Sequence, residues 1–408
     1  MKYMGSKKFM LRNGLGELIR DQLQHANRFV DPFCGSGSVV YFVAQNFDKQ
    51  IIACDLQEYA VVLANAVISR TQKTDTELLK KDWLDIAEKK IQKSKLFLKA
   101  TNLDKLYSKN IRKWVKESRK LCETKSIIGP VWNAYGGHYF SPKQSLTFDY
   151  LIKTLPQDKE LRNLCLASVI GAASKCAASP GHTAQPFQPT KTAKKFIKDA
   201  WEIDVIKSCE SILEEIAKNY AKTKGIALVS SAQQITSTLM KGDLVIVDPP
   251  YSGVQYSRFY HVLETIARGK CGSVSGVGRY PAWAERPQSE FSNISTSIKA
   301  LEDLMSGLIK KEVTVIFTFP KGKCSNGLSG EKVREIAEKW FNIDGESRTH
   351  EHPICGKFST MGGNNKTKIK GDRVKAARIM SEEIILLLKP KTNVDITRVD
   401  TTKIYECR

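Results

Sequence analysis

Near its start the chain reads Arg28-Phe29-Val30-Asp31-Pro32-Phe33-Cys34-Gly35-Ser36-Gly37, a short apolar run that ends in an acid and passes into a glycine-rich turn. The run has the length and composition of a β-strand, and residues 38–45 have the pattern of a helix. A second strand-like run, 50–55, is followed by a second helical pattern at 58–69. This βαβα order favours a parallel sheet, so we expect an α/β fold.

Strand-like runs return in the second half of the chain. Four of them are rich in Val, Ile, Leu or Phe and are expected to complete the sheet: 225–230, 243–247, 312–319 and 382–388. Helical patterns lie among them at 295–309 and 330–341, and residues 70–224 are mostly helical in pattern. At 408 residues the chain exceeds the roughly 250–300 at which single domains stop growing. We therefore expect 1–69 and 225–408 to form two parts of one core, split by a helical insertion at 70–224.

The composition is that of a globular protein with a polyanionic partner. It is 41% hydrophobic and 26% charged, with 64 Lys and Arg against 43 Asp and Glu, a net charge of +21. Such a charge points first to nucleic acid, and a generic solubilising charge is the alternative. No apolar run approaches the roughly 18–20 residues that span a bilayer, and the start lacks the apolar stretch of a signal peptide. We expect a cytoplasmic protein with no membrane partner.

The positive charge is concentrated in two segments. Residues 89–125 hold thirteen Lys and Arg against three acids, and residues 348–378 hold eight against two around a Gly-Gly-Asn-Asn sequence. We expect the first segment to face DNA, although a solvated helical face would have the same composition, and the second to be a loop that clamps phosphate. Gln185 and Gln188, in a loop rich in Pro and Gly, are candidates for reading base edges.

The cysteines and histidines indicate neither disulfides nor a metal. None of the ten cysteines forms a CxxC pair, so they are expected to be reduced thiols. The run 350–355 places two His and one Cys close together, but a fourth ligand is not evident and a polar loop explains it equally well. We expect no metal site.

The glycine-rich turn and the next strand end form the first site pattern. Glycines let a ligand approach the backbone, and the start of the following helix presents free N–H groups. The turn is not GxGxxG and lacks the lysine of a phosphate loop, so the evidence for a dinucleotide or nucleoside triphosphate site is weak. Asp55 closes the next strand 24 residues after Asp31, where a carboxylate can bind both ribose hydroxyls. A cationic nucleoside such as S-adenosylmethionine fits both acids, and an ordinary turn between strand and helix is the alternative.

The second pattern is the apolar strand 243–247 followed by Asp248-Pro249-Pro250-Tyr251. Ligands bind at such strand ends in open α/β sheets. The prolines stiffen the turn and leave the Pro249 carbonyl free to accept a hydrogen bond, and Asp248 supplies a second acceptor. Two acceptors can hold both hydrogens of an exocyclic amino group and aim its lone pair at an electrophile, while Tyr251 stacks on the base. The pattern predicts a site for the amino group of a base.

Together these motifs resemble the S-adenosylmethionine-dependent amino methyltransferases of DNA, in particular the Dam-like, α-group adenine methylases with a DPPY motif. In that group a short motif precedes the glycine-rich turn, found here as 2–7, and a target-recognition region lies between the early and late strands. The sequence near the end also matches, with 361–365 before a basic run and the segment 381–390. The resemblance implies a Rossmann-like methyltransferase sheet with a largely helical target-recognition insertion at 70–224.

The resemblance also implies roles for individual residues. The cofactor-binding positions are Tyr3, Lys7, Asp31, Phe33, Gly35, Gly37, Asp55 and Asp248. The catalytic positions are Asp248, Pro249, Pro250 and Tyr251. Asp55 would hold the ribose hydroxyls and Asp31 would lie near the methionine end of the cofactor, and no metal is required.

The implied activity is site-specific methylation of the adenine amino group, with the adenine flipped out of double-stranded DNA. A restriction-modification or phage-defence role, with a partner nuclease and association with the nucleoid, is the expected setting. A methyltransferase acting on RNA or on cytosine amino groups remains open, as does a catalytically idle nucleic-acid-binding module on the same fold. Residues 252–261 are expected either to line the base pocket or to pack as a helix, and His261 is expected to be structural.

Overall fold

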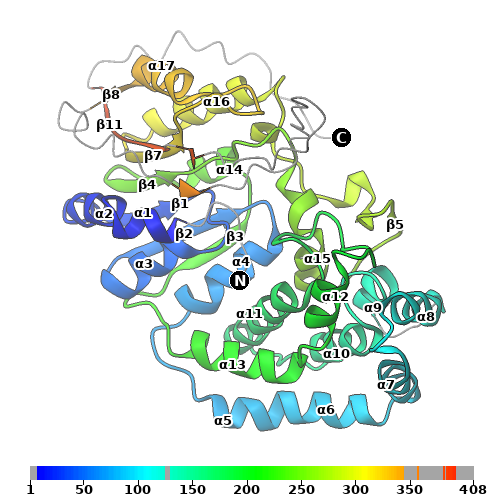
Figure 1. Cartoon of the computed structure of the whole chain (residues 1–408). Coiled ribbons are helices and arrows are strands. Elements are labelled where there is room, and N and C mark those ends of the chain that lie inside the picture. The colour runs from blue at the N-terminus through cyan, green and yellow to red at the C-terminus, as the bar shows by residue number, and fades with distance from the viewer. Residues whose placement is uncertain (1–6, 125–128, 344–355, 358–379, 382, 392–408) are drawn as a thin grey trace, which may run out of the picture.

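The computed structural model describes residues 7–124, 129–343, 356–357, 380–381 and 383–391. At its centre is a seven-stranded sheet in the order β3-β2-β1-β4-β7-β11-β8 (Figure 1). The strands are β1 (Arg28–Asp31), β2 (Gln50–Asp55), β3 (Ile226–Val229), β4 (Asp243–Val247), β7 (Thr314–Pro320), β8 (Phe341–Ile343) and β11 (Glu383–Pro390). The first five in this order pair in parallel, whereas β11 runs antiparallel to both β7 and β8. The predicted α/β class with a mostly parallel sheet is confirmed.

The sheet is buried on both faces. Phe29 and Leu244 enter one hydrophobic core, and their chain neighbours Val30 and Val245 enter the other. This follows from the period of two in a strand, and it explains why the strands read as continuous apolar runs rather than as alternating ones.

Helices cover the two faces as separate layers, which lie on opposite sides of the sheet in Figure 1. The first layer contains α2 (Leu15–Leu23), α3 (Ser38–Asn46) and α4 (Glu58–Ile68), preceded by the short α1 (Lys8–Arg12). The second contains α14 (Ala232–Ile235), η2 (Thr236–Thr238), α16 (Ser297–Ile309) and α17 (Gly330–Trp340). The sheet and its two helix layers therefore form a three-layer core, in which the strand ends remain accessible for a site.

Between α4 and β3 the described residues form helices and no named strand. They are α5 (Thr76–Leu79), η1 (Lys80–Leu84), α6 (Asp85–Gln92), α7 (Lys95–Tyr107), α8 (Ile111–Glu123), α9 (Pro130–Tyr135), α10 (Pro142–Lys153), α11 (Lys159–Cys176), α12 (Lys194–Trp201) and α13 (Val205–Ala217). Helices α11 and α13 pack on α4 and share the core of the first layer. Further out, α8 and α12 form a small core of their own, where the rings of Trp114 and Trp201 meet edge to face at 5.1 Å. The inner helices thus extend the α/β core, and the boundaries at 69 and 224 stay a prediction.

The segment after β4 holds one helix that was an open alternative for residues 252–261 and several short elements that the sequence did not indicate. It contains α15 (Tyr256–Arg268), a hairpin of β5 (Val274–Ser275) and β6 (Tyr280–Pro281), and the short helices η3 (Trp283–Glu285) and η4 (Glu290–Ser292). Helix α15 packs against α4, α9 and α11, so this segment joins the sheet to the helical region (Figure 1).

Some predicted features fall outside the described residues. They are residues 2–6 of the N-terminal motif, including Tyr3, the run 350–355, and most of the basic segment 348–378, of which only β9 (Gly356–Lys357) is described. Strand β9 pairs antiparallel with β10 (Met380–Ser381). In the described ranges no helix has the length and apolarity to cross a bilayer. Those same ranges hold no cluster of three His, Cys, Asp or Glu side chains suited to a metal ion.

Candidate active site

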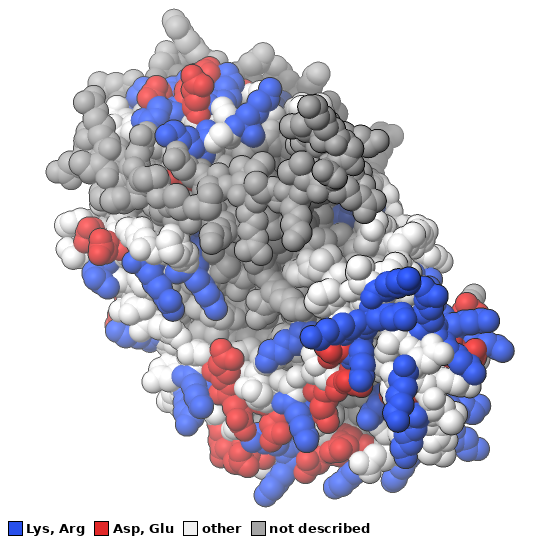
Figure 2. Space-filling view, viewed as in Figure 1, with Lys and Arg blue, Asp and Glu red and all other residues white. Residues whose placement is uncertain are grey.

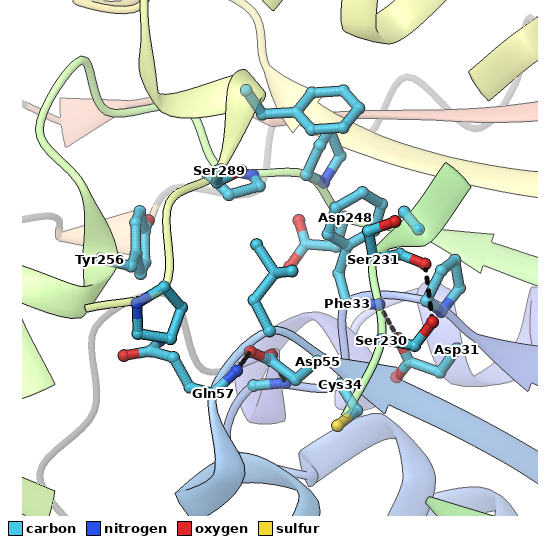
Figure 3. A pocket seen from close by; sticks show the side chains of 18 of the residues that line it. Asp31, Phe33, Cys34, Asp55, Gln57, Ser230, Ser231, Asp248, Tyr256 and Ser289 are labelled. Carbon is cyan, nitrogen blue, oxygen red and sulfur yellow. Dashed lines mark hydrogen bonds between the residues drawn. The ribbon is translucent and has the colours of Figure 1, made fainter. Parts of the chain in front are cut away.

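A cavity of about 450 Å³ opens at the carboxyl ends of β1, β2, β3 and β4. Each strand end contributes a polar residue to its lining: Asp31, Asp55, Ser230 and Asp248. Figure 3 shows these side chains around one space, with Tyr256 and Ser289 across from them. The volume lies within the range of about 300–1,000 Å³ typical of small-molecule sites.

The turn after β1 places Asp31 at the base of the cavity. The Phe33 N–H donates to Asp31 Oδ1 at 3.0 Å, which fixes the carboxyl group at the strand end. Asp31 is almost fully buried, and this burial raises the pKa of its carboxyl group to about 8, although the Phe33 hydrogen bond opposes the rise. A buried acid without a cation in the described structure is suited to receive a positively charged ligand.

The two glycines of the turn have different tasks. Gly35 lines the cavity, whereas Gly37 stands at the N-terminal cap of α3 and does not reach the lining. Gly37 adopts a left-handed conformation with φ of 73°, and a Cβ there would lie 3.1 Å from the Tyr41 ring. Its need for glycine comes from the start of α3, which aims the turn at the cavity.

Asp55 is held by backbone donors on both carboxylate oxygens. The Gly35 N–H donates to Oδ2 at 3.0 Å and the Gln57 N–H donates to Oδ1 at 2.9 Å. Burial raises the pKa of Asp55 to about 6, although these hydrogen bonds oppose it. Asp55 is therefore a carboxylate at neutral pH with a single orientation.

Asp248 lies at the end of β4 within a buried ionic cluster. The Lys7 ammonium contacts Asp248 Oδ1 at 2.8 Å and Glu383 Oε2 at 3.0 Å, and the Thr318 hydroxyl donates to Asp248 Oδ1 at 2.9 Å. Burial lowers the pKa of Lys7, but the charges of Asp248 and Glu383 outweigh it and raise that pKa above its ordinary value. Lys7 thus remains protonated and faces the catalytic carboxylate that the sequence predicts.

The turn after Asp248 is supported from beneath by Asn326. This fully buried amide donates to the carbonyl oxygens of Pro250 and Phe291, each at 3.0 Å. The contact joins the Asp-Pro-Pro-Tyr turn to η4, so both approach the cavity as one rigid unit.

Aromatic side chains form the apolar walls of the cavity. Tyr251 and Tyr256 meet edge to face at 6.5 Å, and Phe33 and Phe291 do so at 5.3 Å. Burial raises the pKa of Tyr251 to about 12, so its phenol is uncharged at neutral pH. The cavity combines flat apolar walls with carboxylates at its base, which suits a ligand with an aromatic ring and polar edges.

The structure brings most of the predicted site residues together. The predicted residues that line this cavity are Lys7, Asp31, Phe33, Gly35, Asp55, Asp248, Pro249, Pro250 and Tyr251. Lining residues that the sequence reasoning missed include Gln57, Ser230, Ser231, Ser289 and Phe291. Ser230 ends the predicted strand 225–230 and Ser231 follows it, so the strand-end rule could have found both serines, whereas 289–291 have no such signal.

Residues 252–261 divide between the two roles expected for them. Gln255, Tyr256 and Ser257 line the cavity, and residues 256–261 form the start of α15. His261 lies outside the cavity lining, with its ring nitrogens 3.1 Å and 2.9 Å from the carbonyl oxygens of Arg258 and Gly278. Burial lowers its pKa to about 4. These contacts make His261 a structural residue, as predicted.

The two glutamines proposed to read bases are placed differently. Gln185 is exposed, while the Gln188 side-chain oxygen accepts a hydrogen bond from the Arg119 guanidinium at 3.1 Å. Their loop is fixed to α15, because the Thr183 hydroxyl donates to the Phe259 carbonyl at 2.7 Å. Of the pair, Gln185 has the freer side chain for a partner.

Fold and site together define an α/β protein with a small-molecule cavity at its strand ends. Residues 3–306 match the model of the D12 class N6 adenine-specific DNA methyltransferases, and the chain belongs to this family. This confirms the resemblance inferred from the motifs. It also fits the site, because the matched range includes every predicted catalytic residue and the three strand-end acids.

Two curated modification methylases are similar to the chain. Modification methylase LlaI of Lactococcus lactis subsp. lactis is 23% identical over 403 residues, covering 95% of this chain and 55% of the relative. Modification methylase StsI of Streptococcus sanguinis is 24% identical over 106 residues, covering 26% of this chain and 15% of the relative. The chain thus spans about half the length of LlaI.

Proposed function

We propose that this protein is a site-specific DNA adenine methyltransferase that transfers a methyl group from S-adenosylmethionine to the exocyclic amino group of adenine. The observation that carries the proposal is the convergence of Asp31, Asp55 and Asp248 with Tyr251 on one cavity at the strand ends. Membership of the D12 class supports the same reaction. The strand order, with an antiparallel strand near one edge of a parallel sheet, supports a Rossmann-like methyltransferase core.

The first half of the cavity fits S-adenosylmethionine. Asp55, fixed by two backbone donors, would accept from the ribose hydroxyls, and buried Asp31 would receive the ammonium group of the methionine end. Phe33 offers an apolar wall and Gly35 a close approach to the backbone. When bound, S-adenosylmethionine supplies an electrophilic methyl group. Tyr3, outside the described residues, stays a prediction as a further contact.

The second half fits the target base. Asp248 and the Pro249 carbonyl would accept the two hydrogens of the amino group, which turns the nitrogen lone pair toward the methyl group. Tyr251 would stack on the base after it leaves the duplex. The rate enhancement would come mainly from positioning, since held reactants gain a large effective concentration. The rigid support of the turn by Asn326 suits this role.

The outer helices offer a surface for duplex DNA. Figure 2 shows Lys and Arg gathered on the side where α7 and α8 lie in Figure 1. On α8 the exposed cations are Arg112, Lys113, Lys116 and Lys120. A surface of this kind binds phosphates without regard to sequence, so it supports a DNA-contacting role for the helical segment 70–224, which we propose as the target-recognition region.

A second DNA-contacting feature lies beside the cavity. Trp283 is 64% exposed, and the Arg286 guanidinium lies 5.3 Å from its ring centroid. The next residues, 287–291, line the cavity itself. An exposed aromatic ring with a cation, a few residues from the cavity lining in the chain, suits the DNA left behind when one base is taken out of the stack.

The biological setting is proposed from the relatives. Both are modification methylases, which supports a restriction-modification or phage-defence role and a partner nuclease. Acting on DNA would place the protein in the cytoplasm, at the nucleoid. Its only cofactor would be S-adenosylmethionine, with no metal needed.

Incubation with methyl-labelled S-adenosylmethionine tests the proposal. The label should appear as N6-methyladenine in double-stranded DNA, and Asp248→Ala should abolish it. Label in RNA or in cytosine would redirect the substrate assignment, and no label on any DNA would remove the proposed activity. If no label appears, titration calorimetry with S-adenosylhomocysteine tests for an idle nucleic-acid-binding module, because such a module has no need to bind the cofactor.

A further inference from the structure

The two oxygens of the Asp248 carboxylate have different surroundings. Oδ1 accepts from both the Lys7 ammonium, at 2.8 Å, and the Thr318 hydroxyl, at 2.9 Å. Two donors fill the acceptor capacity of one carboxylate oxygen. The Asp248 side chain is nevertheless 24% exposed and lines the cavity, so the carboxylate still faces the space where a ligand would lie.

The donors to Oδ1 are themselves held by the sheet. Thr318 is fully buried on β7, and Glu383 is buried at the start of the neighbouring strand β11. In the register of these strands Thr318 pairs with Ile385, two residues from Glu383. The Glu383 carboxylate contacts the Lys7 ammonium at 3.0 Å, so β11 fixes Lys7 and Lys7 fixes Asp248.

Burying the Glu383 carboxylate costs the folded state free energy, which indicates that the carboxylate has a role at this position. Among the described residues its second oxygen, Oε1, is buried without a hydrogen-bond partner. Burial accordingly raises the pKa of Glu383, and an apolar residue would suit this part of the core better. The contact that Glu383 does make is directed at the ammonium group beside the catalytic carboxylate.

We infer that Thr318 and Glu383 are positioning residues, which commit Asp248 Oδ1 to the protein and leave Oδ2 as the oxygen that accepts from the adenine amino group. The inference rests on the proposed function and adds to it the acceptor atom and the two residues that select it. Neither residue touches the substrate. Each acts through Asp248, Thr318 directly and Glu383 by way of Lys7.

Thr318→Val is the sharpest test, because it removes the hydroxyl and keeps the shape. Without this donor the carboxylate can rotate, so kcat should fall at least about tenfold, as for the loss of one hydrogen bond to a charged group. The Kd for S-adenosylhomocysteine and the KM for DNA should stay within about twofold. Thr318→Ser should restore kcat, and Thr314→Val, on the same strand but outside the cavity, should behave as wild type. Unchanged kcat in folded Thr318→Val overturns the inference.

Glu383→Gln tests the second residue by its charge. Losing this carboxylate lowers the pKa of Lys7, so the alkaline limb of the kcat profile should move to lower pH. Glu331→Gln, at an exposed site on α17, should leave the profile in place. An unmoved limb in Glu383→Gln would show that Glu383 does not act through Lys7.

Crystal structures distinguish failure of this inference from failure of the proposed function. Absence of N6-methyladenine with the wild-type protein counts against the function alone. A Thr318→Val structure in which the Asp248 carboxylate keeps its wild-type orientation overturns the inference, whether or not the wild type is active. A rotated carboxylate with the fold retained supports it.

Discussion

Replacing Asp55 with Asn changes the charge of the proposed cofactor site while keeping its shape. Asp55 accepts the Gly35 N–H on Oδ2 and the Gln57 N–H on Oδ1, at 3.0 and 2.9 Å. An asparagine has one oxygen and one NH₂ group, so its NH₂ must face one of these two donors. A buried donor left without an acceptor costs about 1–3 kcal/mol, so Asp55→Asn should lower the free energy of unfolding by that amount.

The effect on the cofactor is larger. Hydrogen bonds to an ionised carboxylate are worth about 1.5–3 kcal/mol, roughly twice those to a neutral acceptor. Losing about half of the strength of two such bonds removes about 1.5–3 kcal/mol, which weakens binding by about 10- to 150-fold at about 1.4 kcal/mol per tenfold. Titration calorimetry with S-adenosylhomocysteine, the stable product, measures this loss, and urea unfolding measures the stability.

The same residue predicts a pH dependence. Because burial raises the pKa of Asp55 to about 6, its carboxylate is lost as the pH falls through that value. Cofactor affinity should therefore drop below about pH 6 in the wild type, and Asp55→Asn should lack that drop. Wild-type affinity in Asp55→Asn at pH 7, with the fold intact, would refute the assignment of Asp55 to the ribose.

Three further predictions concern charge. Asp248→Ala should abolish methyl transfer while changing the Kd of S-adenosylhomocysteine by less than about tenfold, as filter assays and calorimetry would show; residual turnover near wild type would contradict its catalytic role. Burial raises the pKa of Asp31 to about 8, so its carboxylate forms as the pH rises through that value. Affinity for S-adenosylhomocysteine should rise up to about tenfold from about pH 7 to pH 9, with proton release on binding, and Asp31→Asn should flatten this rise. Replacing Lys113, Lys116 and Lys120 with Ala should reduce the slope of log K for duplex DNA against log salt by up to about 0.9 per lost phosphate contact, whereas three exposed lysines replaced elsewhere should leave it unchanged.

The parallel sheet and its strand-end acids were predictable because their signals are local. A buried parallel strand reads as a short apolar run, and a predicted site residue ends the strand, as Asp31 and Asp55 do, or follows it directly, as Asp248 does. The hairpin of β5 and β6 and the three-residue β8 could not be predicted in this way. Their strands are too short to show a period, and their pairing depends on neighbours far along the chain.

The division of the chain into a core and a helical insertion shows the same limit of prediction from sequence. The helical character of residues 70–224 is evident from their composition, but the packing of α11 and α13 on α4 is not. A helix period indicates which face of a helix is apolar without indicating what covers it. The shared core therefore makes the inner helices part of the scaffold that supports the site, and it leaves the outer basic helices as the surface that we propose for DNA.

The amino-acid sequence was enough to predict the α/β class and the methyltransferase family, and to propose the cofactor acids and the catalytic turn, because each of these is a contiguous pattern of a few residues. The arrangement around Asp248 required the folded chain. Lys7 and Glu383 are 376 positions apart, and Thr318 lies 70 positions from Asp248, so their contacts leave no local signal. Folding brings β4, β7 and β11 to the same end of one sheet, and at that end the low-dielectric interior makes their hydrogen bonds and charges act on a single carboxylate.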